Sequence, residues 1–501
     1  MKPVRNLILI QSDQHRGGWM GCVGAGYVHT PNMDALAARG VRFSQAHCSY
    51  PLCGPSRMSF LTGLHPHRNG LHTNEDNLPS DRPTFAHALG LGGYHSVLCG
   101  RMHFCGVDQR HGFVERIFGD YNACYPGGHK ASGSGDYSGA PINGRPAMDA
   151  ARSAEHTYFL DYDEGVTCAA EDYLADYAAA NNPKPLALCV GFFNPHSPFM
   201  APPEYVEAAR QRATTMPQPQ PKRADLNHWE RGWLKQQNME EVTAKDAQEA
   251  RIQYSALISY LDDRIGRVLK AAESLPGETL VLYWSDHGEG VADGGRINKG
   301  ALDQTSLHVP FLVAPLQAGA CGIKDPGRVW DSPVSLLDLA PTLTELTGSP
   351  EIPDADGLSL VPVLDGTAER AAWSEREIFA EVSIFPHLPP ARMIRRGRWK
   401  YLYFHDDRDL LFDLETDPNE QNNLLPAPDE GGHGFHQKLD PAIQALADEL
   451  KARVLAEWDP ERERRESQRA WNRRSFNVRW GQEIGATQWG LMEVWPALKS
   501  Q

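Results

Sequence analysis

The sequence has no apolar run long enough to cross a membrane or to form the core of a secretion signal. Its first apolar run, residues 7–10, is short and leads straight into a polar turn that begins at Gln11. A membrane-spanning helix needs about 20 apolar residues, and the core of a signal peptide needs about 7 to 15. We therefore expect a protein without a membrane anchor, located in the cytoplasm.

Cysteine is also scarce, and its spacing is irregular. The 501 residues hold nine cysteines, an odd number, and no two of them form a Cys-x-x-Cys pair. This pattern argues against a disulfide framework, a zinc knuckle and a thioredoxin-like redox motif. Reduced thiols agree with a cytoplasmic location.

Positive charge is in deficit, and no segment repeats internally. Lysine and arginine number 49 against 64 aspartates and glutamates, so the net charge is −15 at pH 7. A chain this acidic has no broad basic surface with which to release counterions from a nucleic acid. We therefore expect no nucleic-acid partner, and an anionic substrate would require a local cluster of cations.

What the sequence does contain is a set of continuous apolar runs separated by helical patterns. The runs at 7–10, 186–193 and 279–284 are typical of strands buried on both faces of a parallel sheet. The segment from about 241 to 272 carries apolar residues at helical spacing. This alternation predicts an α/β fold in which a large, mixed but mostly parallel sheet is sandwiched by helices.

The hydrophobic pattern of the sequence changes near residue 376. Short alternating segments begin there, and a helical pattern follows at about 436–457. We expect a catalytic α/β domain over residues 1–375 and a small subdomain, an antiparallel sheet with a helix, over residues 376–460.

The C-terminal tail, residues 461–501, mixes arginine with glutamate and carries Trp480, Trp489 and Trp495. A disordered tail is usually poor in aromatic residues. We therefore expect the tail to pack on a neighbouring subunit, so that the protein is a homo-oligomer.

Two polar segments interrupt the α/β pattern. Residues 124–146 are rich in glycine and serine, and residues 205–240 contain a proline-glutamine hinge at 217–221. A loop as long as 124–146 in a compact domain is either disordered or a pocket wall. We expect this loop and the insertion at 205–240 to be among the walls of the substrate pocket. The histidines of residues 65–74 lack the spacing of metal ligands, and we expect most of them to be solvated.

One stretch combines the residues of an anion-binding, reactive site. It reads Cys53-Gly54-Pro55-Ser56-Arg57 and continues to Leu61-Thr62-Gly63. Proline suits the first turn of a helix, so Cys53 would lie at a helix N-terminus, where free N–H groups and the dipole favour an anion. Arg57, one turn further, adds a planar fork of donors suited to an oxyanion. The alternative is a buried structural cysteine beside a helix cap.

This stretch resembles the signature of type I sulfatases, Cys/Ser-x-Pro-Ser-Arg followed by Leu-Thr-Gly, and the similarity covers most of residues 4–425. It implies the alkaline-phosphatase-like fold and superfamily, nearest the branch of choline sulfatases, arylsulfatases and phosphonate monoester hydrolases. It also implies that a formylglycine-generating enzyme oxidises Cys53 to an aldehyde, formylglycine. The hydrated aldehyde would attack a small-molecule sulfate ester and then expel sulfate by C–O cleavage, a release that a serine could not achieve.

Two strand ends supply groups for a divalent metal. Asp13 and Gln14 follow the first apolar run, and Asp286 and His287 follow the run at 279–284. Ligands gather at the carboxyl ends of strands in α/β sheets. Oxygen ligands favour Ca²⁺, whereas the imidazole makes Mn²⁺ the alternative. The resemblance adds Cys53, once converted, to this metal, and Gln14 with His287 is similar to the choline-sulfatase and phosphonate-hydrolase branch.

The resemblance further implies a group of cations around the sulfate. Arg101 follows a strand expected at 95–99 and stands where related sulfatases carry lysine, so the charge is kept but the reach differs. Together with Arg57 and Lys299, it is expected to neutralise the equatorial oxygens.

Three more positions receive roles from the resemblance. His196, held between Pro195 and Pro198, is expected to protonate the leaving oxygen as general acid. His103 is expected to deprotonate the second hydroxyl of the hydrated aldehyde. Asn74 aligns with a substrate-binding asparagine of some relatives.

Two alternatives stay open. A phosphonate monoester or phosphodiester hydrolase would use the same site, although Arg101 and His103 favour a sulfatase. A non-catalytic relative would keep Cys53 as a thiol and would bind an anion or a metal without turnover.

Overall fold

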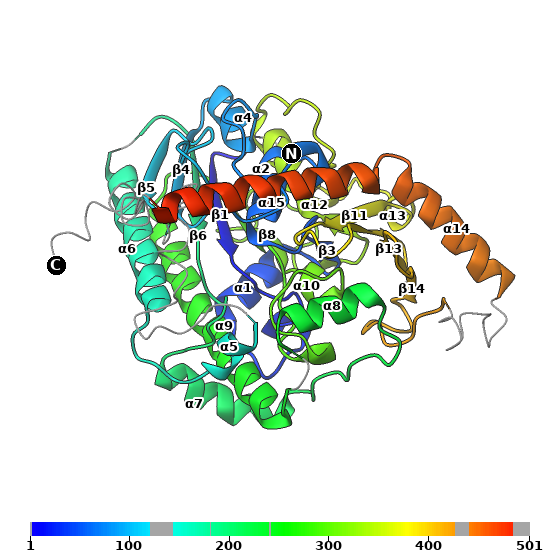
Figure 1. Ribbon diagram of the computed structural model, residues 1–501. Helices are drawn as coiled ribbons and strands as arrows, with labels where there is room; N and C mark the ends of the chain where they lie inside the picture. Colours follow the sequence, from blue (N-terminus) through cyan, green and yellow to red (C-terminus); the bar gives the residue numbers. More distant parts are fainter. Residues whose placement is uncertain (1–2, 121–143, 181, 240–241, 426–439, 484–501) are drawn as a thin grey trace.

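The computed structural model describes residues 3–120, 144–180, 182–239, 242–425 and 440–483. Most of the predicted loop at 124–146 therefore lies outside the described residues. The described chain forms an eight-stranded sheet, a separate four-stranded sheet and the helices that pack on them (Figure 1). Within these ranges, no helix combines the length and the apolar character that a membrane span requires.

The large sheet is mixed but mostly parallel, as predicted. In spatial order its strands are β5 (Glu115–Phe118), β4 (His95–Gly100), β6 (Leu186–Gly191), β1 (Asn6–Ser12), β7 (Thr279–Ser285), β8 (Phe311–Pro315), β2 (Val41–Phe43) and β9 (Arg328–Trp330). β8 runs antiparallel to both of its neighbours, and the other pairs are parallel. The parallel arrangement brings the carboxyl ends of β4, β6, β1 and β7 to one edge.

Alternate residues of β1 face two layers of helices. Leu7 and Leu9 belong to one apolar cluster, and Ile8 and Ile10 belong to another on the opposite face. The first layer contains α2 (Cys53–Thr62), α4 (Phe85–Leu91) and α11 (Leu339–Thr347), and the second contains α1 (Pro31–Arg39), α6 (Tyr158–Ala179) and α9 (Ala244–Ala272). Full burial of each such side chain contributes roughly 1.5–3 kcal/mol, so the central strands are held from both sides.

Short elements fill the connections. They are α3 (Pro66–Asn69), α5 (Gly144–Asp149), α7 (Pro203–Arg212), α8 (His228–Gln236), α10 (Gln304–Leu307), α12 (Val361–Leu364), α13 (Arg370–Ser374), the 3-10 turns η1 (Gly21–Val23), η3 (Ala213–Thr215), η4 (Asp293–Gly295) and η5 (Leu336–Asp338), and the paired strands β3 (Ala46–His47) and β10 (Val334–Ser335). The segment at 205–240 thus carries parts of two helices, and residues 217–221 between them are non-helical, as expected.

The smaller sheet is antiparallel and has the order β11-β12-β13-β14. Its strands are β11 (Glu377–Val382), β12 (Ala391–Arg396), β13 (Trp399–Phe404) and β14 (Leu410–Asp413), and α14 (Pro441–Leu455) packs against β12 and β13. The predicted sheet-plus-helix unit is confirmed. The domain boundaries at 375 and 460 stay a prediction.

The last described helix, α15 (Pro460–Glu483), lies across the rest of its own chain and is drawn in red in Figure 1. Ser467 Oγ donates to the Ser383 carbonyl at 2.8 Å, and Arg474 lies 2.9 Å from Glu75. The described part of the tail therefore packs on its own subunit. The predicted contact with a neighbouring subunit stays a prediction.

The histidines of residues 65–74 depart from the solvated loop that we expected. His72 is only 3% exposed, and its Nδ1 lies 3.9 Å from Glu463 of α15. His67 Nδ1 lies 3.0 Å from Glu381 of β11. These acidic partners come from the far end of the chain, so the local spacing of the histidines could not reveal them.

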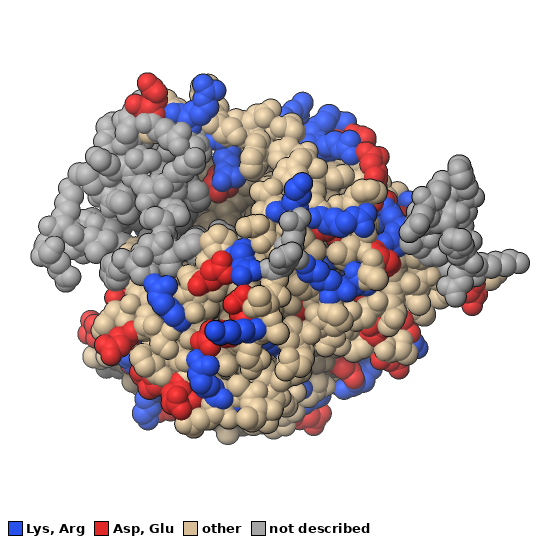
Figure 2. Space-filling view, turned by 60° about the horizontal axis from the view of Figure 1, so that its bottom comes forward, with Lys and Arg blue, Asp and Glu red and all other residues tan. Residues whose placement is uncertain are grey.

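Charged side chains are distributed without a broad basic patch on the face shown in Figure 2, where acidic and basic groups are interspersed. The eight cysteines among the described residues are all free thiols, as expected from their spacing.

Candidate active site

Cys53 is the first residue of α2, and its thiol points into a buried cluster. Leu52 before it is extended, and the helix continues through Pro55, so the predicted helix N-terminus is confirmed. Sγ lies 3.1 Å from His287 Nε2 and 3.6 Å from Asp13 Oδ1. Burial, followed by the charge of Asp13, raises the pKa of the Cys53 thiol to about 12. The unmodified residue is therefore a protonated thiol at neutral pH and a poor nucleophile.

Asn74 supports the start of α2. Its Oδ1 accepts the backbone N–H of Gly54 at 2.8 Å. A β-carbon on Gly54 would lie 3.1 Å from the Asn74 Cα, which explains the glycine at this position. The structure thus brings Asn74 next to Cys53, in contact with the backbone of the following residue.

Asp13, Asp286 and His287 meet at the carboxyl edge of β1 and β7. One ligand atom from each of them and Cys53 Sγ all lie within 4.8 Å of one another, and all four residues are buried. His287 Nδ1 lies 3.0 Å from the Gly288 carbonyl, which only accepts, so Nδ1 carries the proton and Nε2 presents a lone pair. Burial also lowers the pKa of His287, which keeps the ring neutral. Two carboxylates and an imidazole lone pair form a donor set that fits a divalent cation.

Arg57 holds the two carboxylates together. Its Nε donates to Asp286 Oδ2 at 2.8 Å, its Nη2 to Asp13 Oδ2 at 3.1 Å, and its Nη1 to Gln11 Oε1 at 3.0 Å. Because the guanidinium takes the Oδ2 atoms, the Oδ1 atoms face Cys53 and His287. Arg57 is fully buried and therefore orders the acidic pair from behind.

Arg101 contacts the same cluster from the end of β4. Its Nε donates to Asp13 Oδ2, and its Nη2 donates to His103 Nδ1 at 3.0 Å. A guanidinium only donates, so His103 accepts at Nδ1 and, when neutral, carries its proton on Nε2. Asp120 holds this turn by accepting the backbone N–H groups of Met102 and His103 at 3.2 and 2.6 Å.

Lys299, His196 and Gln14 complete the site. Lys299 Nζ donates to Gln14 Oε1 and lies 2.6 Å from His196 Nε2. His196 Nδ1 lies 2.6 Å from the Ser197 carbonyl, so Nε2 accepts from the lysine. Burial, together with the charge of Lys299, lowers the pKa of His196 well below its usual value, and the ring is neutral. Its Nε2 lies 4.0 Å from Asp13 Oδ1, which joins this group to the cluster.

The sequence analysis did not identify two buried carboxylates, Asp163 and Glu289, that anchor loops of the site. Asp163 of α6 accepts the backbone N–H groups of Phe193 and Asn194 at 2.7 and 2.9 Å, just before His196. Glu289 accepts the backbone N–H of Asn298 at 2.7 Å, just before Lys299. Glu289 follows Asp286-His287 directly and could have been noticed, whereas nothing near Asp163 in the sequence points to His196.

The fold and the site together define an alkaline-phosphatase-like hydrolase, in which a residue at a helix N-terminus meets acidic and imidazole groups at the edge of a mostly parallel sheet. A family profile described as Sulfatase matches residues 5–349, and a second, described as N-sulphoglucosamine sulphohydrolase, C-terminal, matches residues 295–448. The chain belongs to the sulfatase family, a family of sulfuric ester hydrolases.

Individual relatives agree with this assignment. The chain is 34% identical to a choline-sulfatase of Rhizobium meliloti, over 91% of this chain and 87% of that protein. It is 27% identical to an arylsulfatase of Clostridium perfringens, over 90% of this chain and 95% of that protein. The crystal structure of a phosphonate monoester hydrolase of Agrobacterium radiobacter shares the fold, with a TM-score of 0.69 and 23% identity over 91% of this chain and 95% of that one.

Proposed function

We propose that the protein hydrolyses a sulfate monoester of a small alcohol or phenol, using a formylglycine made from Cys53 and one divalent cation. The convergence of Cys53 with Asp13, Asp286 and His287 in a buried site is the observation that carries this proposal. An aldehyde at position 53 would have its hydrate hydroxyls near the place that Sγ takes, beside the acidic and imidazole groups. The high pKa of the thiol supports the need for this conversion.

The cation would be held by Asp13, Gln14, Asp286 and His287, with residue 53 as the fifth protein ligand. Their oxygens favour Ca²⁺, and the imidazole makes Mn²⁺ the alternative. When bound, such a cation lowers the pKa of an adjacent hydroxyl and offsets negative charge on the group under attack.

Arg101 and Lys299 would receive the sulfate oxygens, since both present cationic groups on the cluster. Arg57 would act by keeping Asp13 and Asp286 in place. Because a sulfate ester is an anion and the chain is acidic overall, this local positive group is what makes binding favourable.

The proton for the leaving oxygen would come through His196 and Lys299. The ammonium donates to the neutral His196 Nε2, so a proton can pass along this contact to an oxygen placed beside the pair. General acid catalysis of this kind accelerates a reaction by roughly 10²–10⁴-fold. His103 presents an N–H at Nε2, and the base role that the resemblance implies would require Arg101 to release Nδ1.

Choline sulfate is the first substrate to test, because the relative at 34% identity is named a choline-sulfatase. Aryl, alkyl and sugar sulfates complete the screen. Turnover of any one of them supports the proposal, and failure of all with converted, metal-loaded protein contradicts it.

A phosphonate monoester or phosphodiester hydrolase is the second candidate, favoured by the fold shared with the phosphonate monoester hydrolase. Arg101 and His103 favour the sulfatase over this second candidate. Comparing kcat/KM for an aryl sulfate and an aryl phosphonate monoester decides between the two, and a large phosphonate preference would reverse the order.

Intact-protein mass spectrometry tests the modification itself. Expression together with a formylglycine-generating enzyme, the proposed maturation partner, should lower the mass by about 18 Da when the thiol becomes an aldehyde. Cys53→Ala should keep the fold and lose the mass change and all turnover. A wild-type protein that stays unmodified and inactive in such a host would instead indicate the non-catalytic relative.

A further inference from the structure

Glu289 is a buried carboxylate with no assigned part in the reaction. It is 0% exposed, and its Oε2 accepts from the amide nitrogen of Gln14. Its Oε1 accepts the backbone N–H of Val291 at 2.9 Å and of Asn298 at 2.7 Å. This one side chain therefore contacts the proposed metal ligand Gln14 and the backbone of Asn298, which directly precedes Lys299.

The contact with Gln14 determines which way its amide points. The amide turns its NH₂ group to two acceptors, Glu289 Oε2 and, at 3.3 Å, Asn298 Oδ1, and it turns its own oxygen away from them. The oxygen is then the atom that Lys299 Nζ contacts. The Gln14 backbone is fixed as well, because its N–H donates to Asp286 Oδ1 at 3.1 Å. Rotating the amide by half a turn would bring two oxygens together at Glu289 and two donors together at Lys299.

The loop that follows Glu289 needs such an anchor. Val291, Ala292 and Asn298 all have positive φ, at 42°, 69° and 68°. Non-glycine residues in this region are strained, and they persist where their surroundings over-determine them. The two backbone hydrogen bonds to Glu289 lie at both ends of this loop and close it behind Lys299.

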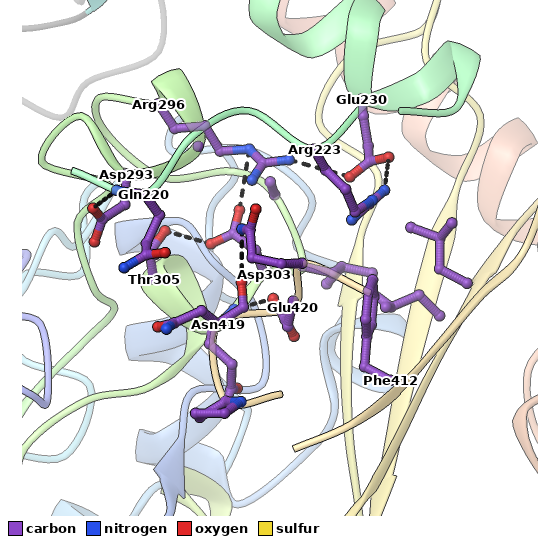
Figure 3. Close-up of a pocket in the computed structure, with 18 of the residues that line it drawn as sticks. Gln220, Arg223, Glu230, Asp293, Arg296, Asp303, Thr305, Phe412, Asn419 and Glu420 are labelled. Atoms are coloured by element: carbon purple, nitrogen blue, oxygen red, sulfur yellow. Dashed lines mark hydrogen bonds and ion pairs between the residues drawn. The ribbon is translucent and has the colours of Figure 1, made fainter. Parts of the chain in front are cut away.

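The outer side of the same loop is also held, by an ionic cluster around a cavity of about 50 Å³ (Figure 3). Arg296 donates to Glu230 at 3.1 Å and lies 3.4 Å from Asp303. The carboxylates of Glu230 and Asp303 thus both have Arg296 as a partner. This ionic cluster braces the outer side of the loop. On the inner side the loop reaches Gln14 through Glu289 Oε2, through Asn298 Oδ1 at 3.3 Å and through Lys299 Nζ.

We propose that Glu289 is a positioning residue, which turns the Gln14 oxygen into the site and holds Lys299 beside it, and thereby raises the affinity of the site for a divalent cation and for sulfate. This inference rests on the proposed function. Groups that orient metal ligands commonly change metal affinity by about 10–100-fold when they are replaced.

The test measures binding of Mn²⁺ alone to the metal-free protein, and inhibition by inorganic sulfate. Glu289→Gln can present an NH₂ group to Gln14 and remove the acceptor. We expect the Kd for Mn²⁺ to rise by about 10–100-fold and the inhibition constant of sulfate to rise in parallel. Gln14→Met, which leaves the Glu289 loop bonds intact, should weaken Mn²⁺ binding as much, and it serves as the second variant if Glu289→Gln does not fold.

A matched control and a double variant separate positioning from general stability. Asp262 is a buried carboxylate that accepts the backbone N–H groups of Asn32 and Met33 at 3.0 and 2.9 Å, away from the site. Asp262→Asn should lower Tm but leave the Kd for Mn²⁺ within about twofold. Since Glu289 acts through Gln14, the Glu289→Gln, Gln14→Met double variant should bind Mn²⁺ about as weakly as either single variant.

Two results would overturn the inference. One is a folded Glu289→Gln or Gln14→Met protein with wild-type affinity for both Mn²⁺ and sulfate. The other is a double variant whose losses multiply. If the wild-type protein turns over sulfate esters while either result is found, the proposed function survives and only this inference fails. A wild-type protein that neither binds Mn²⁺ nor hydrolyses any ester contradicts both.

Discussion

Arg57 shows how one side chain organises the charges of the site. It lies between Asp13 and Asp286 with no exposure to solvent. Two carboxylates packed this closely would repel each other without a cation between them. The guanidinium offsets this repulsion and leaves their other oxygens facing Cys53 and His287.

Replacing Arg57 by leucine should therefore cost stability as well as activity. The change leaves Asp286 without its guanidinium and Asp13 with Arg101 as its remaining arginine partner. Removing one member of a buried ion pair costs about 3–5 kcal/mol. Urea unfolding of metal-free protein measures this loss, and added Mn²⁺ should recover part of it by replacing the lost charge. A metal-free variant as stable as wild type would show that Arg57 does not hold the pair.

At the scale of the element, α15 is tied to the site loop that carries Asn74. Glu463 near its start is buried beside His72, and Arg474 reaches Glu75. Burial, and then the charge of Glu381, raises the pKa of Glu463 to about 7. At pH values between about 4.5 and 7, Glu463 therefore holds a proton while α15 is docked and releases it when α15 undocks.

The docking of α15 should weaken as the pH rises from about 4.5 to 7. Glu463 stabilises the docked form fully below its unfolded pKa, and this contribution is lost as the pH passes the folded value, with an effect of about 3 kcal/mol at most. Protection factors of the α15 amides against hydrogen exchange, which correct for the pH dependence of intrinsic exchange, measure the change between pH 5.5 and pH 8. Glu463→Gln should remove the pH dependence and protect the helix at pH 8. Equal protection factors of the wild type at both pH values would contradict the prediction.

At the scale of the whole molecule, the described part of the tail exposes two large aromatic side chains. Phe476 and Trp480, one turn apart on α15, are 71% and 43% exposed. Large exposed aromatic side chains of this kind are typical of interaction sites. They support the proposed homo-oligomer, although the described part of α15 packs on its own chain.

Deleting residues 461–501 should lower the mass of the particle in solution to that of a monomer. Multi-angle light scattering at one protein concentration measures the mass of the deletion variant and of the wild type. The double variant Phe476→Ser, Trp480→Ser serves as the control, because it keeps the contacts of α15 with its own chain and removes only the exposed aromatics. An oligomer that survives both changes would show that the subunits meet elsewhere.

The fold, and the segments that meet at the candidate site, could be predicted from the sequence to a large extent. Continuous apolar runs mark β1, β6 and β7 as buried strands, because burial on both faces demands apolar residues at every position. The polar residues after these runs, such as Asp13 and Asp286, and Pro55 in the first turn of α2 then locate the site. The signature around Cys53 determined the family.

Only the tertiary structure decided which of these groups act on one another. Arg57 meets Asp286 across 229 positions of the chain, and Lys299 meets Gln14 across 285. The anchoring carboxylates Asp163 and Glu289 likewise bind backbone groups of site loops. Local sequence records which residues must be buried and where a strand or helix ends. The pairing of charges depends on how distant segments close on one another, and that is set by the packed core as a whole.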